Sequence, residues 1–258
     1  MLDSQTLSIV SDAVSDRRFA MAAGIAVVAG LVRGFTGFGS ALIYMPLISA
    51  VYGPRLAAPT LLLIDTVCSL PFAIKAIPSC NRREVGLVMI SGAIGVPIGA
   101  AALLYVGPLA LRWLIAVLVL ISVGILVSGW RYHGRPTVAA SLGVGALAGF
   151  GAGAVQIGAP PLLVYWLGGQ NSAATVRANI MVYFIMQGAL AMLAYFYGAL
   201  FTAQALALSL LLGVPFGVSL AFGARWFHGT SDVFYRRLAY IIIAISGLIS
   251  LPVFDALR

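Results

Sequence analysis

The sequence predicts an all-α, multi-pass membrane protein made of two homologous halves, each with four apolar segments. Of its 258 residues, 62% are hydrophobic and only 9% are charged, and the mean hydropathy is +1.06. Soluble domains carry about a quarter charged residues, so this composition is typical of a protein that folds in lipid. Apolar stretches long enough for a crossing of about 20 residues recur along the chain. A third observation, an internal repeat, gives the division into halves.

The repeat is clearest in two glycine-rich segments. Gly30–Leu47 reads GLVRGFTGFGSALIYMPL, and Gly145–Leu162 reads GALAGFGAGAVQIGAPPL. With an offset of 115 (145 minus 30), Gly34 matches Gly149 and Pro46 matches Pro161. Clustered glycines weaken a helix interior and let other groups approach the backbone closely. Paired Gly/Pro interruptions at matching places in two halves indicate the binding site of a transporter.

The chain divides into an N-terminal tail or surface helix, a first repeat, a connecting loop and a second repeat, at 1–18, 19–131, 132–136 and 137–258. Each repeat holds one broken segment followed by three full spans. In the first these are Phe19–Tyr52, then Leu56–Ile77, Val85–Val106 and Leu109–Trp130. In the second they are Thr137–Leu167, then Ser172–Tyr197, Ala203–Phe227 and Val233–Leu257.

The first broken segment is too long for one crossing and is predicted to divide at Gly34–Gly39 into two arms of similar length. Arms of about 15 residues would give about 22 Å of helix, less than a bilayer core of about 30 Å. The spans after it repeat as well, since Gly95–Gly99 matches Gly213–Gly217 at an offset of 118 (213 minus 95). The placement of Lys and Arg in the loops favours inverted halves with re-entrant broken segments. Parallel halves with crossing broken segments are the alternative.

Arg33 stands directly before the first glycine break. A charge inside a span costs several kcal/mol, so it indicates function. Its guanidinium offers a planar fork of donors suited to oxyanions. The second arm begins near Ser40, and its free N–H groups also favour an anion. Gln156 stands near the matching start in the other half. The alternative is that Arg33 pairs with backbone carbonyls or reaches the headgroups.

Other polar residues inside the predicted spans have two interpretations each. Asp65 lies near the middle of its span and is either a proton-coupling group or a fixed counter-ion in a static pair. Arg177 either contacts the solute or anchors at the headgroups. Asn179, Tyr183 and Gln187 recur every four residues and form one polar stripe. This stripe faces a cavity or makes interhelical hydrogen bonds.

No motif for catalysis, nucleotide binding, metal or cofactor is present, which argues against an enzyme and indicates that active transport would use an ion gradient. The two cysteines, Cys68 and Cys80, form no CxxC pair. The net charge of +8 comes from basic residues scattered between apolar runs, which fits membrane loops and argues against nucleic-acid binding.

The paired motifs, Gly34-Phe-Thr-Gly-Phe-Gly with Pro46 and Gly149-Phe-Gly-Ala-Gly with Pro161, resemble those of the sulfite exporter TauE/SafE family. The resemblance covers nearly the whole chain from about Phe19. It implies transport of sulfite, sulfonates or similar small sulfur-containing anions across the bacterial inner membrane. The family's glycine motifs face the transport path, which implies that role here for Gly34, Gly37, Gly39, Gly149, Gly151 and Gly153. The sequence departs from the family at Ser40 and Gln156, where further glycines are expected.

These observations together predict a secondary transporter for a small sulfur-containing oxyanion, coupled to protons through Asp65. The expected solute contacts are Arg33, Gly34, Thr36, Gly37, Gly39, Ser40, Gly149, Gly151, Gly153, Gln156, Arg177 and Asn179. A passive small-anion channel and a non-transporting membrane subunit of a larger complex are the alternatives. The expected partners are the anion and the lipid bilayer, with a homodimer as one option for the assembly.

Overall fold

The computed structural model describes residues 17–129, 137–168, 171–226, 232–249 and 251–252. Within these ranges the chain is helical and contains no strand. Most of the predicted tail at 1–18 and all of the loop at 132–136 lie outside the described residues. The helices are α2 (Arg17–Thr36), α3 (Ser40–Tyr52), α4 (Pro54–Ala76) with the short η1 (Ile77–Ser79), α5 (Arg82–Tyr105), α6 (Pro108–Ser128), α7 (Val138–Val155), α8 (Ala159–Gly168), α9 (Ala173–Tyr197), α10 (Ala203–Trp226) and α11 (Asp232–Ile249).

Seven of the described helices are long and apolar enough to cross a membrane. They are α2, α4 together with η1, α5, α6, α7, α9 and α10. The prediction of a multi-pass, all-helical membrane protein is therefore confirmed. The last predicted span, Val233–Leu257, corresponds to α11, which ends at Ile249. Residues 253–258 lie outside the described part of the chain.

The first predicted break is present, between α2 and α3. Gly37 and Gly39 adopt left-handed backbone angles, with φ of 77° and 98°, and this ends the helix. The prediction of two arms of similar length is wrong. The helix α2 has 20 residues and α3 has 13, or about 30 Å and 20 Å of helix. Gly34 lies inside α2 and does not interrupt it. The 20 residues of α2 alone match the thickness of a bilayer core.

The second break lies later than the glycine cluster predicts. Gly149, Gly151 and Gly153 all remain within α7, which ends at Val155. Gln156 then takes a left-handed conformation with φ of 58°, and α8 begins at Ala159. Glycine alone does not end a helix here, because close packing against neighbouring backbone holds the cluster in place.

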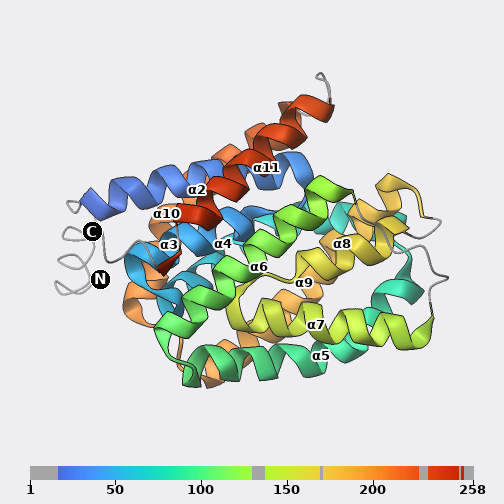
Figure 1. Cartoon of the computed structure of the whole chain (residues 1–258), viewed down its shortest axis with the longest axis horizontal. Coiled ribbons are helices and arrows are strands. Elements are labelled where there is room, and N and C mark those ends of the chain that lie inside the picture. The colour runs from blue at the N-terminus through green and yellow to red at the C-terminus, as the bar shows by residue number, and fades with distance from the viewer. Residues whose placement is uncertain (1–16, 130–136, 169–170, 227–231, 250, 253–258) are drawn as a thin grey trace.

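The most extensive helix contacts join α5 to α7 and α10 to α2, so each glycine-rich helix packs along a helix from the other half of the chain. Figure 1 shows α5 and α7 running side by side. A Cβ atom on Gly153 would lie 2.1 Å from the Val96 carbonyl oxygen, and one on Gly30 would lie 2.4 Å from the carbonyl oxygen of Phe216. Small residues allow this approach of backbones, as they do in membrane helix pairs generally.

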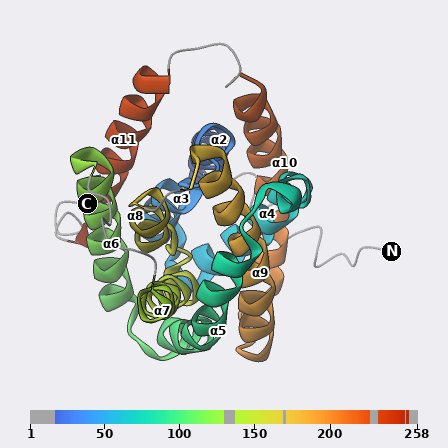
Figure 2. The same ribbon diagram turned by 90° about the vertical axis from the view of Figure 1, so that its right-hand side faces the viewer.

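The short helices are enclosed by the longer ones. Figure 2 shows α3 and α8 surrounded by the longer helices. The helix α3 packs on α4, α8 packs on α9, and α4 and α9 also contact each other. This arrangement brings the α2–α3 and α7–α8 breaks towards the same region of the interior.

The glycine contacts predict opposite effects for the same substitution at two positions in α7. Gly153→Ala should force α5 and α7 apart and cost about 1–3 kcal/mol, since the new methyl would meet backbone. Gly143→Ala is the control, because Gly143 is exposed in the same helix with nothing within 4 Å of the added Cβ. It should be neutral or stabilising by about 0.5–1 kcal/mol. Thermal unfolding of both purified variants tests this, and equal midpoints would contradict it.

Candidate functional site

Arg33 occupies the last turn of α2, just before the break, and its side chain is only 6% exposed. Its Nη2 donates to Asp65 Oδ2 at 2.8 Å, its Nη1 to the Gly37 carbonyl at 2.8 Å, and its Nε to Ser69 Oγ at 3.3 Å. The guanidinium carbon also lies 5.4 Å from the ring centre of Phe184. Each guanidinium nitrogen therefore has a partner in the interior, and Arg33 does not reach the headgroups.

Asp65, in the middle of α4, connects three elements. Besides the ion pair with Arg33, its Oδ1 accepts hydrogen bonds from Ser40 Oγ at 3.2 Å and from Ser69 Oγ at 3.5 Å. The carboxylate thus holds the end of α2 and the start of α3 against α4. Asp65 is 22% exposed, so removing one partner should cost less than the 3–5 kcal/mol that is typical of fully buried pairs.

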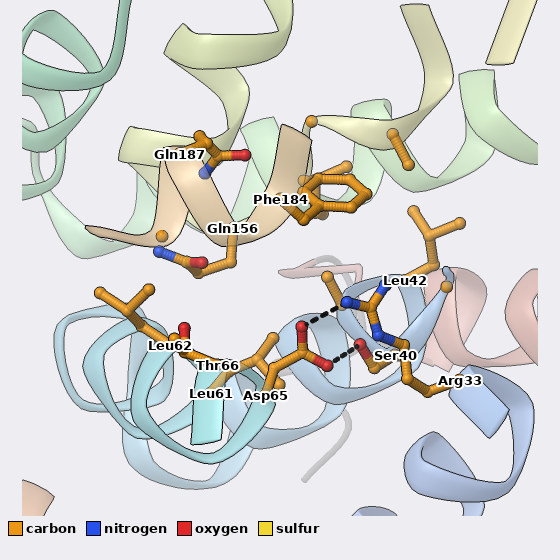
Figure 3. Close-up of a pocket in the computed structure, with 16 residues that line it drawn as sticks. Arg33, Ser40, Leu42, Leu61, Leu62, Asp65, Thr66, Gln156, Phe184 and Gln187 are labelled. Atoms are coloured by element: carbon orange, nitrogen blue, oxygen red, sulfur yellow. Dashed lines mark hydrogen bonds and ion pairs between the residues drawn. The ribbon is translucent and has the colours of Figure 1, made fainter. Parts of the chain in front are cut away.

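A cavity lies between the two helix breaks, and we call it the central cavity (Figure 3). One wall carries Arg33, Asp65 and Ser40, and the facing wall carries Gln156 and Gln187. The other lining residues are Gly39, Ala41, Leu42, Leu61, Leu62, Thr66, Ile157, Gly158, Ala159, Phe184 and Gly188. Its free volume is about 40 Å³. A water molecule needs about 10–15 Å³ on this scale, so the cavity has the size of about three waters or one small oxyanion.

The start of α3 presents backbone donors to this cavity. Gly39 precedes the helix and no side chain caps its first turn. The first N–H groups of a helix have no intrahelical partner, and the positive end of the helix dipole favours an anion. The start of α8 differs, because Pro160 and Pro161 in its first turn carry no N–H. The two breaks meet at one cavity but are chemically unequal.

Two amides form the wall facing Arg33. Gln156 Nε2 donates to Tyr195 Oη at 3.1 Å, and that hydroxyl donates to the Gly153 carbonyl at 2.7 Å. Gln187 is 2% exposed, and its Oε1 has no hydrogen-bond partner among the described residues. The sequence places Gln187 in a polar stripe but gives no signal for Tyr195, which stands among other aromatic residues.

A second, smaller cavity of about 20 Å³ lies on the other side of Arg33. It is lined by Arg177, Gly34, Gly37 and Ser69 among others, and Arg33 borders both cavities. Arg177 Nη2 donates to the Gly34 carbonyl at 3.4 Å. Arg177 therefore lies in a chamber adjacent to the central cavity and does not line the central cavity itself.

Five of the residues predicted to contact solute line neither cavity. Thr36 Oγ1 bonds the backbone of Val32 and Phe38 and so secures the end of α2. Asn179 Oδ1 accepts from the Asn81 backbone N–H at 2.7 Å, which ties α9 to the start of α5. The other three are the second-half glycines Gly149, Gly151 and Gly153.

These three glycines serve close packing. An added Cβ on Gly149 would lie 2.6 Å from the Gly92 carbonyl oxygen, and one on Gly151 would lie 2.3 Å from that of Ile157. Their small size brings α5 and the α7–α8 turn close to α7. The predicted polar stripe on α9 also divides, because Gln187 lines the cavity whereas Asn179 makes an interhelical bond.

Comparison with known proteins assigns the chain to a family. Residues 22–249 match the family described as sulfite exporter TauE/SafE. No curated protein and no solved structure matches the chain. The family match spans far more than half of the sequence and includes both helix breaks, Arg33 and the two amides. The chain therefore belongs to the sulfite exporter TauE/SafE family of membrane transporters.

Proposed function

We propose that the protein is a secondary transporter that moves a small sulfur-containing oxyanion across the bacterial inner membrane, with the central cavity as its binding site. The observation that carries this proposal is that both helix breaks and one buried arginine line a single cavity of oxyanion size. Broken helices whose N-terminal ends point at a midplane cavity are a recurring way to hold an anion in a membrane. Family membership supplies the solute class.

In this proposal the anion competes with Asp65 for Arg33. Without solute, the guanidinium is held by Asp65, Ser69 and the Gly37 carbonyl. An arriving oxyanion takes over part of that donor fork and gains the free N–H groups at the start of α3. Asp65 then loses its cationic partner. A lone carboxylate in a membrane interior is costly, and uptake of a proton removes that cost.

The same exchange would couple anion movement to protons. Arg33 borders both cavities. When its side chain moves from one partner to another, the barrier between the two cavities changes. A passive anion channel would use the same cavity without binding a proton at Asp65. A non-transporting subunit would use the breaks only for packing. The two predictions below separate these alternatives.

We also propose that the two halves are inverted repeats with re-entrant broken segments. Matching contacts support this. Gly95 approaches the Ala146 carbonyl and Gly223 approaches the Leu31 carbonyl, and Leu31 precedes Ala146 by the same 115 residues (146 minus 31) that separate the two motifs. These contacts favour matching Gly95 with Gly223 instead of Gly213. In Figure 1, α8 leads back towards the side of the molecule at which α7 begins, as a re-entrant segment would.

Arg33→Ala should abolish most transport. Loss of a buried charge partner costs about 2–5 kcal/mol, so we expect uptake of labelled sulfite into proteoliposomes to fall at least ~30-fold. Lys75→Ala removes the same charge from an exposed position outside both cavities and should leave uptake unchanged. The double variant Arg33→Ala/Asp65→Ala leaves no lone charge, so it should unfold near the wild-type temperature and still not transport. Normal uptake by a folded Arg33→Ala protein would refute the assigned site.

Asp65→Asn should uncouple transport from protons. Asparagine keeps the size of the side chain but cannot exchange a proton, so we expect flux down an anion gradient to persist within a few-fold while stimulation by a pH gradient disappears. Labelled methanesulfonate is the suitable solute, because its charge does not change with pH. The passive-channel alternative predicts no stimulation even in the wild-type protein. Stimulation that survives in Asp65→Asn would exclude Asp65 as the coupling group.

A further inference from the structure

The wall of the central cavity opposite the Arg33–Asp65 pair consists of two amide side chains, and we call Gln156 and Gln187 the amide wall. Figure 3 shows both across the cavity from Asp65 and Ser40. Gln156 comes from the α7–α8 break and Gln187 from α9. An amide can present either its oxygen or its N–H groups to a solute, so its orientation determines what it recognises.

The surrounding hydrogen bonds fix the orientation of Gln156. The Gly153 carbonyl lies in the last turn of α7, where no following helical N–H reaches it. Tyr195 supplies the donor, at 2.7 Å, and uses its only hydroxyl proton to do so. The Tyr195 oxygen can then only accept, so the Gln156 group at 3.1 Å from it must be the NH₂. Oε1 is the end of the amide left for a solute.

The backbone conformation of Gln156 indicates that its side chain has a function. Its φ of 58° lies in the left-handed region that glycine adopts without cost. A residue with a Cβ pays a conformational penalty there, and such residues gather at functional sites. A glutamine that strains the turn and places its amide on the cavity is best explained by contact with the solute.

Gln187 supplies an independent observation. It is 2% exposed, its Oε1 has no partner among the described residues, and it lines the same cavity. A buried acceptor without a donor costs free energy that a bound group can recover. The Gln187 oxygen has almost no accessible surface, so a solute reaches it only when the amide group turns over, whereas the Gln156 oxygen is not covered in this way and is the acceptor that the amide wall offers to the cavity.

The charges on the other wall favour a monoanion. Without solute, Asp65 neutralises Arg33 at 2.8 Å; once the solute displaces Asp65 and that carboxylate takes up a proton, the wall carries one charge from Arg33 and about half a charge from the dipole of α3. A dianion would bring a larger uncompensated charge into the interior than a monoanion. Sulfite and its chemical relatives become monoanions by keeping one O–H group.

We propose that the central cavity selects a monoanionic oxyanion that retains one O–H, of the bisulfite or bicarbonate type. Its bare oxygens face Arg33 and the start of α3, and its O–H donates to an amide oxygen of the amide wall. This inference rests on the proposed function, because it concerns the same binding site, and it makes Gln156 and Gln187 the residues that distinguish the protonated from the unprotonated solute.

Two matched pairs of anions test the proposal on the full-length protein in lipid nanodiscs. Bisulfite and chlorate are both pyramidal monoanions, but only bisulfite carries a proton, and bicarbonate and nitrate form the corresponding planar pair. Affinities are measured by calorimetry, at mildly acidic pH for the first pair and mildly alkaline pH for the second. We expect the proton-bearing anion of each pair to bind at least ~5-fold more tightly.

Two substitutions should remove that preference. Gln187→Leu deletes one acceptor, so the affinity ratio within each pair should fall towards one while chlorate binding stays the same. Gln156→Gly should lower the ratio too, and it should unfold at the wild-type temperature or above because the left-handed turn is relieved. Gln156→Gly therefore still tests the proposal if the Gln187→Leu protein does not fold. Gln204→Leu, at an exposed position in α10, is the control and should change neither quantity.

The outcomes separate this inference from the proposed function. If none of the four anions binds, the assignment of the central cavity as an anion site fails, and this inference fails with it. If all four bind with equal affinity within each pair, the site stands and only the proton selectivity is refuted. A preference for chlorate and nitrate that disappears in Gln187→Leu would mean that the amide wall presents N–H groups, which would overturn the proposal.

Discussion

The ion pair between Arg33 and Asp65 is the interaction on which the rest of the interior depends. The guanidinium is buried and the carboxylate is partly buried, among helices whose other residues are mostly apolar. Each charge is costly there without its partner, so the pair constrains three elements at once, the end of α2, the start of α3 and the middle of α4. The break at Gly37–Gly39 is held in place by the same bonds, because the Gly37 carbonyl also accepts from Arg33.

Close backbone packing is the second constraint, and it explains why the glycines are so numerous. Contacts of α5 with α7 and of α10 with α2 are possible only where no side chain stands between the backbones. These contacts connect the two halves of the chain and hold α7 and α2 in position. The breaks therefore reach the central cavity because of glycines that lie outside it, such as Gly153 and Gly30.

Much of the fold was predictable from the sequence, because composition and apolar length determine which segments suit a bilayer. The first break was predictable as well, since two glycines in it must adopt positive φ. The second was placed a few residues too early, because a glycine cluster can mark either a break or a packing surface, and only the neighbouring helix decides which. Arg33, Ser40 and Gln156 stand out in the sequence as polar residues near the breaks and Asp65 as a carboxylate in the middle of its span, and all four line the cavity. Tyr195 and the distinct position of Arg177 depend on contacts between distant helices, which sequence spacing does not encode.

The differences between the two breaks carry more functional information than their likeness. At the first, an uncapped helix start and an arginine make one wall of the cavity electropositive. At the second, two prolines remove backbone donors and a strained glutamine presents an oxygen. The two similar helix breaks thus enclose a cavity with one cationic wall and one wall of hydrogen-bond acceptors. A solute that satisfies both must itself be asymmetric, negative at one end and a hydrogen-bond donor at the other, and this requirement follows from the places where the second motif departs from the first.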